Sequence, residues 1–173
     1  MDVMCIGVLA WDVIGAVPRL AEPGRPVHID KGIEIGIGGK AGNVAVDLVK
    51  LGLEGSRVCV VSPLGDDRWG DLLEERLTEL GITVRAQRVP DKPTAMCMGI
   101  ILNGRYNQWY GMCSINHEFY ADHIIAEIKE LKPRLVVVTA ASSLTRIEES
   151  FEGLLSEAKK AGSKVYIDLI RFG

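Results

Sequence analysis

Short apolar runs alternate with amphipathic segments along the chain, and this alternation restricts the fold more than any other feature of the sequence. Four runs have the length and continuous hydrophobicity of strands buried on both faces; they cover residues 3–9, 57–62, 135–139 and 164–168. The intervening segments carry apolar residues at helical spacing, over residues 43–51, 71–80, 117–131 and 146–161. Repeated strand–helix units favour a parallel sheet with right-handed crossovers. The sequence therefore predicts an α/β fold, with a Rossmann-like parallel sheet flanked by helices.

Two regions depart from this pattern and predict a second, smaller sheet. Residues 13–37 contain three prolines, followed by alternation of apolar and polar residues over 27–30 and 33–37. Residues 94–112 show the same alternation, and Asn103-Gly104 within them is a dipeptide typical of hairpin turns. We expect these segments to form a small antiparallel β lid set against the α/β body, so that residues 1–173 form one domain with the lid inserted in it.

Such a lid has two compatible interpretations. It covers a ligand and excludes water from it, or it is an edge hairpin that pairs with a second subunit. The sequence leaves both open.

Composition and charge exclude several classes of protein. The chain has 47% hydrophobic and 25% charged residues, which is ordinary for a soluble domain, and a formal net charge of −3. A nucleic-acid-binding protein would be expected to carry a basic face. No apolar run has the length of a membrane span, and the first residues lack the basic start of a signal peptide, so we expect a cytoplasmic protein that binds neither nucleic acid nor membrane.

The cysteines predict no metal site. None of the four belongs to a CxxC pair, and their spacing matches no zinc pattern. Cys5, Cys59 and Cys97 lie inside apolar runs, so we expect them to be buried free thiols.

The stretch Gly38-Gly39-Lys40-Ala41-Gly42-Asn43 is the strongest candidate for a binding site. Two adjacent glycines allow a backbone to approach a ligand closely, because no Cβ stands in the way. An amide, a lysine and the N–H groups of a helix start follow within one turn, which suits a hydroxyl-rich or anionic small molecule. Asp12, which follows the first apolar run, is the acidic candidate for the same ligand.

Each of these residues also has a purely structural interpretation. Gly38-Gly39 would then be a tight turn, Asn43 a helix cap, Lys40 a solvated side chain and Asp12 a partner of nearby backbone N–H groups.

Three further residues also have both a structural and a functional interpretation. For Asp67 and Trp69 we favour structural roles, in a turn and in packing. Trp11 fits either the mouth of the site or the core.

Four motifs together resemble the N-terminal part of the ribokinase-like (PfkB-type) carbohydrate kinase superfamily. They are Gly7-Val8-Leu9-Ala10-Trp11-Asp12, then Gly38 to Asn43 with Leu51-Gly52, then Gly65-Asp66-Asp67-Arg68-Trp69-Gly70, and finally Pro93-Thr94-Ala95 leading to Asn103-Gly104-Arg105. The resemblance covers essentially all of the chain. It implies a sugar or nucleoside kinase that uses ATP and Mg²⁺ to phosphorylate a hydroxymethyl group.

The resemblance also implies roles for the candidate residues. Asp12 would accept hydrogen bonds from substrate hydroxyls, Gly39 and Asn43 would bind other hydroxyls beside Gly38, and Lys40 would add a donor or a positive charge.

The family's Gly-Ala-Gly-Asp element, whose aspartate takes the proton of the attacking hydroxyl, does not occur here, and the chain ends directly after an expected strand. We therefore expect a substrate-binding half without catalytic residues of its own, inactive in isolation. It would pair through the lid with a second copy, or with a complementary C-terminal half. The alternative is a non-catalytic sugar-binding or assembly module.

Overall fold

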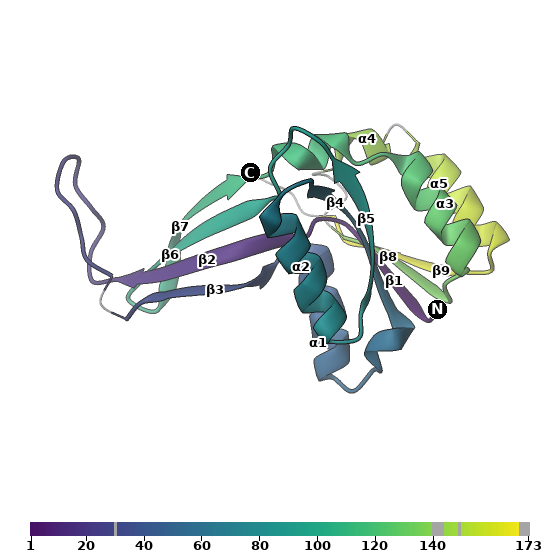
Figure 1. The fold of residues 1–173 in the computed structure, drawn as a ribbon, viewed down its shortest axis with the longest axis horizontal. Coiled ribbons are helices and arrows are strands. Elements are labelled where there is room, and N and C mark those ends of the chain that lie inside the picture. Colours follow the sequence, from purple (N-terminus) through teal and green to yellow (C-terminus); the bar gives the residue numbers. More distant parts are fainter. Residues whose placement is uncertain (30, 140–143, 149, 170–173) are drawn as a thin grey trace.

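Five parallel strands form the core sheet, in the order β5–β4–β1–β8–β9 (Figure 1). The structure is a computed structural model and describes residues 1–29, 31–139, 144–148 and 150–169. The strands are β1 (Val3–Ile6), β4 (Val58–Gly65), β5 (Thr83–Val89), β8 (Leu135–Val138) and β9 (Lys164–Ile167). The predicted parallel sheet is confirmed, and β1 lies at its centre, as expected for a strand that is buried throughout.

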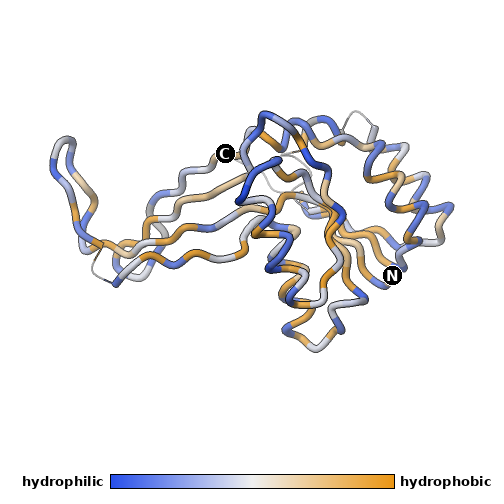
Figure 2. Tube along the Cα trace, viewed as in Figure 1, coloured by the Kyte–Doolittle hydropathy of each residue, from blue (hydrophilic) through white to orange (hydrophobic). Residues whose placement is uncertain are grey.

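Helices cover both faces of the core sheet. The helical segments are α1 (Lys40–Lys50), η1 (Gly55–Arg57), α2 (Arg68–Glu79), η2 (Ser114–Glu118), α3 (Ala121–Leu131), α4 (Thr145–Glu148) and α5 (Phe151–Lys160). Alternate residues of β1 serve the two faces. Val3 and Cys5 pack in one cluster with α1 and α2, whereas Met4 and Ile6 pack in the other with α3 and α5. Figure 2 shows the resulting hydrophobic centre between two layers of amphipathic helices.

A second sheet projects from the core and consists of β2 (Ala10–Val17), β3 (Ile33–Gly38), β6 (Met96–Leu102) and β7 (Arg105–Met112) (Figure 1). We call it the lid sheet. Its strand order is β3–β2–β6–β7, with antiparallel pairing of β2 to β3 and of β6 to β7. The two segments predicted to form a second sheet therefore do so.

The central pairing of the lid sheet, β2 to β6, is parallel rather than antiparallel. Both strands leave the core sheet from the same edge, since β2 follows β1 and β6 follows β5, two strands that themselves run parallel. They therefore extend outward in the same direction.

Several boundaries differ from those predicted. The first strand ends at Ile6 instead of residue 9, because the chain turns at Gly7, where a Cβ would lie 2.2 Å from Oγ1 of Thr139. The lid sheet consequently begins at Ala10, before the expected position 13. Residues 27–29 are not a strand, and residue 30 lies outside the described residues. In the described part of the chain, no helix is long and apolar enough to cross a bilayer.

Candidate functional site

The turn between β3 and α1 is anchored to the connection between β1 and β2. Gly39 is the N-cap of α1, with φ 76° and ψ 148°, a conformation that L side chains rarely adopt. A Cβ on Gly39 would lie 2.3 Å from the carbonyl oxygen of Val8, and the Ala41 N–H donates to that same oxygen at 3.2 Å. The glycine is therefore required by both backbone geometry and space.

The carboxylate of Asp12 lies directly against Gly38. A Cβ on Gly38 would stand 2.2 Å from Cγ of Asp12 and 2.3 and 2.5 Å from its two carboxylate oxygens. From the sequence, Asp12 follows the first apolar run, which was expected to be one strand over residues 3–9; in the structure Asp12 is instead the third residue of a separate strand, β2, inside the lid sheet. The antiparallel pairing of β2 with β3 brings it to the turn, because Ala10 is level with Gly38.

The carboxylate of Asp12 is partly buried. No hydrogen-bond donor or cation among the described residues is recorded at its carboxylate, so its structural interpretation as a partner of backbone N–H groups is not supported. Burial raises the pKa of Asp12 above its usual value, because dehydration disfavours the charged form. A carboxylate in this state gains from a ligand that supplies hydroxyl donors.

Lys40 and Asn43 belong to the first turn of α1, and both are exposed. Asn43 follows one turn after Gly39, to whose carbonyl its own N–H donates at 2.9 Å. The helix starts at Lys40, and no side chain caps it, so the interpretation of Asn43 as a cap is wrong. The structure thus brings Asp12 into contact with Gly38, next to the Gly39 turn, whereas Lys40 and Asn43 lie on the adjoining helical turn.

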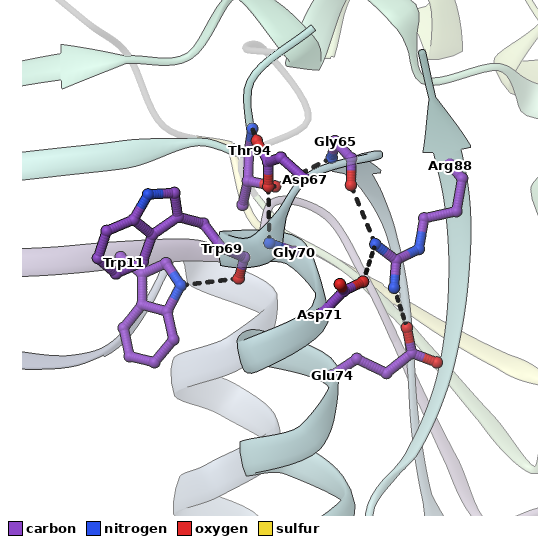
Figure 3. Close-up of polar contacts among 9 residues, drawn as sticks. All are labelled: Trp11, Gly65, Asp67, Trp69, Gly70, Asp71, Glu74, Arg88 and Thr94. Carbon is purple, nitrogen blue, oxygen red and sulfur yellow. Dashed lines mark hydrogen bonds and ion pairs between the residues drawn. The ribbon is translucent and has the colours of Figure 1, made fainter.

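Asp67 ties the start of α2 to the start of the lid sheet (Figure 3). It accepts hydrogen bonds from the Gly70 N–H at 2.8 Å, the Thr94 N–H at 2.8 Å and the Thr94 hydroxyl at 2.7 Å. Burial opposes ionisation of Asp67, but the hydrogen bonds from Thr94, Gly70 and Trp69 outweigh it and lower its pKa. The structural role favoured from the sequence agrees with these contacts.

The two tryptophans beside the site pack on each other. Trp11 is 7% exposed and donates from Nε1 to the carbonyl oxygen of Trp69 at 2.9 Å. The ring centroids lie 6.1 Å apart with an interplanar angle of 69°, an edge-to-face arrangement (Figure 3). Of the two interpretations of Trp11, the structure favours packing at the junction of β2 with α2.

The face of the lid sheet that carries Asp12 also carries two thiols. Residues that lie level on neighbouring strands point to the same face. Asp12 is level with Cys97 on β6, and Cys97 is level with Gly111 on β7. Cys113 follows two residues after Gly111, and its Sγ lies 3.2 Å from where a Cβ of Gly111 would be. Cys97 is half-buried, so the prediction of a buried thiol is wrong for this residue, although it holds for Cys5 and Cys59. The sequence does contain a signal for this exposure. Because side chains alternate between the two faces of a strand, Cys97 points to the face opposite to that of Met96 and Met98.

A comparison with known protein families identifies the family of this chain. The model of the pfkB family of carbohydrate kinases matches residues 1–171. The chain belongs to this family. A comparison with the sequences of curated proteins finds no match.

Solved structures share the fold of this pfkB-family chain. The ribokinase of Giardia lamblia superposes with a TM-score of 0.82 at 21% identity, over 96% of this chain and 53% of the other. The Arabidopsis thaliana ribokinase complexed with ribose and ATP gives 0.76 at 20% identity, over 99% and 54%. The fructokinase of Xylella fastidiosa with bound ATP gives 0.73 at 24%, over 99% and 52%. The chain thus spans about half the length of each of these structures.

Proposed function

We propose that this chain is the sugar-binding part of a pfkB-type kinase that phosphorylates a hydroxymethyl group of a sugar or nucleoside. The observation that carries the proposal is the Asp12 carboxylate, which is partly dehydrated, lacks a recorded partner among the described residues and lies against Gly38 at the entrance of α1. A polyol supplies the hydroxyl donors that this carboxylate lacks. Membership of the carbohydrate kinase family supports a sugar as the ligand.

Each candidate residue then has a distinct role. Asp12 accepts hydrogen bonds from vicinal hydroxyls. The missing side chain at Gly38 leaves the room that this carboxylate itself occupies, and Gly39 lets the turn approach the carbonyl oxygen of Val8. Lys40 and Asn43 project from the first turn of α1 as exposed donors, where the positive end of the helix also favours oxygen atoms. The lid sheet, to which Asp12 belongs, shields the ligand from water.

The described residues do not fit a magnesium site. Among them, no three His, Cys, Asp or Glu side chains are grouped so that they could hold a metal ion. The sequence also lacks the Gly-Ala-Gly-Asp element that the family resemblance associates with proton removal. We therefore expect this chain by itself to bind the sugar without transferring phosphate to it from ATP.

Calorimetric titration with ribose, fructose, adenosine and ATP tests the proposal. We expect binding of at least one polyol, and a loss of about 1.5–3 kcal/mol, roughly 10- to 150-fold in affinity, in Asp12→Asn. Asp66→Asn, which changes an exposed aspartate of the Gly65–Gly70 turn, is the matched control and should bind as the unmodified chain does. Absence of binding by all three polyols, or equal affinity in Asp12→Asn, contradicts the proposal.

The second candidate function, an assembly module, is favoured by the other face of the lid sheet. Val13, Ile35, Met98 and Tyr110 form one level row across all four strands. Three of them are about half exposed: Ile35 at 55%, Met98 at 49% and Tyr110 at 56%. Contiguous exposed apolar side chains mark interaction surfaces, and a second copy of this chain offers the same apolar row in return.

We therefore propose that the lid sheets of two copies pack face to face. Sedimentation velocity should show a dimer that Met98→Lys dissociates, whereas Lys50→Glu, an exchange on the outside of α1, leaves it intact. A monomer at high concentration contradicts this pairing. Because this experiment involves no sugar, the sugar-binding proposal and the pairing proposal stand or fall separately.

A further inference from the structure

Cys97 and Cys113 bring two sulfur atoms into one small space on the Asp12 face of the lid sheet. A Cβ built on Gly111 would lie 3.2 Å from Sγ of Cys113 and 3.8 Å from Sγ of Cys97. Both sulfurs therefore border the room that the missing side chain of Gly111 leaves. The two thiols are hydrogen-bonded to each other, and they come from different elements, β6 and the residue after β7.

The other two cysteines provide a contrast inside the same molecule. Cys5 and Cys59 are fully buried in the core sheet, and burial raises the pKa of each thiol to about 12. Cys97 and Cys113 are both half-buried and within reach of small solutes. Reactivity toward oxidants follows exposure and thiolate content, so the pair differs from the core thiols in the first of these.

The pair also differs from the core thiols in thiolate content. The hydrogen bond with Cys97 lowers the pKa of Cys113 to about 7, although burial and the charge of Asp12 act in the opposite direction. The same hydrogen bond, burial and the charges of Cys113 and Asp12 raise the pKa of Cys97. The lowered pKa increases the thiolate content of Cys113 at neutral pH relative to an unperturbed cysteine.

We propose that Cys97 and Cys113 form a peroxide-sensitive dithiol that closes to an intramolecular disulfide. The Cys113 thiolate attacks a hydroperoxide, so that an S–O bond forms, the O–O bond breaks, and the departing oxygen takes up a proton and leaves as water or an alcohol. The Cys97 thiol then attacks Sγ of the resulting sulfenic acid, an S–S bond forms, and the hydroxyl leaves with the Cys97 proton as water. Two thiols and one hydroperoxide thus give one disulfide, and a dithiol reductant restores the pair.

The disulfide would link β6 to the segment that follows β7, on the face where Cys97 lies level with Asp12. The site is therefore a modification site of the lid sheet. Its formation requires neither sugar nor nucleotide, so it can be tested whether or not the chain binds a sugar.

The test treats the full chain with an equimolar amount of hydrogen peroxide, blocks the remaining thiols by alkylation and maps the peptides by mass spectrometry. We expect single polypeptide chains that have each lost two hydrogen atoms, a Cys97–Cys113 crosslink within one chain, and alkylation of Cys5 and Cys59 only after unfolding. Dithiothreitol should restore all four thiols. A disulfide between two chains, oxidation spread evenly over the four cysteines, or sulfinic acid without a crosslink overturns the proposal.

Two variants separate the steps. Cys113→Ser should slow the loss of accessible thiol on the order of tenfold, because the activated thiolate is gone. Cys97→Ser should leave the first step intact, so that dimedone traps a sulfenic acid at Cys113. Cys59→Ser is the matched control and should form the crosslink at the unmodified rate. If Cys113→Ser reacts as fast as the unmodified chain, the assigned order of attack is wrong.

Discussion

Replacing Asp67 with alanine tests how the core holds the lid sheet. The Asp67 carboxylate accepts three hydrogen bonds, one from the Gly70 N–H in the first turn of α2 and two from Thr94. Thr94 is 1% exposed and lies two residues before β6. Its N–H and hydroxyl would lose their partner in a place that water reaches poorly. The substitution therefore loosens both the helix start and the entry into the lid sheet.

The magnitude follows from these contacts. Loss of an aspartate N-cap costs about 1 kcal/mol. Each hydrogen bond from Thr94 to the charged carboxylate contributes about 1.5–3 kcal/mol when it is removed. The three contacts share one carboxylate, so their contributions overlap and do not simply add. We expect Asp67→Ala to lower the free energy of unfolding by roughly 2–4 kcal/mol, out of a total of about 5–15 kcal/mol for a domain.

Urea unfolding measures this loss. With a slope of about 2 kcal/mol per molar, the midpoint should fall by roughly 1–2 M in Asp67→Ala. Asp66→Ala, at the neighbouring exposed position, should stay within about 0.5 kcal/mol of the unmodified chain. Asp67→Asn keeps a capping side chain and should lie between the two. Equal midpoints for Asp67→Ala and Asp66→Ala would refute the reasoning.

The pH dependence gives a second readout. Although burial acts against ionisation, hydrogen bonds hold the pKa of Asp67 below its usual value. Its contribution to stability is therefore present above about pH 4 and is lost as the pH falls through the lowered folded-state pKa. The stability difference between the unmodified chain and Asp67→Asn should shrink over that range.

Three further predictions concern Asp12 and the glycines beside it. Gly38→Ala places a methyl group where the Asp12 carboxylate lies, so titration should show a loss of sugar affinity of the same order as in Asp12→Asn, with little change in helix content by circular dichroism. Gly39→Ala forces an L side chain to φ 76° and against Val8, and urea unfolding should show a loss of at least about 1–2 kcal/mol. Burial raises the pKa of Asp12, so ionisation of Asp12 lowers the stability of the fold as the pH rises through this raised pKa. Asp12→Asn should therefore unfold at a higher urea concentration than the unmodified chain at pH 7. This difference in stability should vanish below about pH 4, where the carboxyl is protonated in both states. A destabilised Asp12→Asn at pH 7 would show that the carboxylate has a structural partner.

Much of the fold could be read from the sequence because its strands belong to two distinct patterns. The strands β1, β4 and β8 are almost wholly buried and leave continuous apolar runs. The two faces of a lid strand differ in polarity, so apolar residues recur at every second position of the sequence, as Met96 and Met98 do. The edge strand β5 was missed, since its burial is intermediate at all positions but Val89 and its residues Thr83, Arg85, Gln87 and Arg88 resemble a loop.

The site was harder to predict because its decisive contact is tertiary. The motif residues Asp12 and Gly38 were both identified, but the apolar run continues through Leu9 and Ala10, which hid the turn at Gly7 and the start of β2. The contact between the Asp12 carboxylate and Gly38 depends on the register of β2 with β3, which joins residues 26 positions apart. Register of this kind also placed Cys97 beside Asp12, which apolar neighbours in the sequence did not indicate.

The central claim is that Asp12 and the Gly38-Gly39 turn hold a polyol. The most direct measurement is a crystal structure of this chain with the sugar that binds best in the titrations. The account predicts at least two sugar hydroxyls within about 2.5–3.0 Å of the Asp12 carboxylate, with the ring over Gly38. A sugar bound elsewhere, with Asp12 still free of contact to it, would contradict the account.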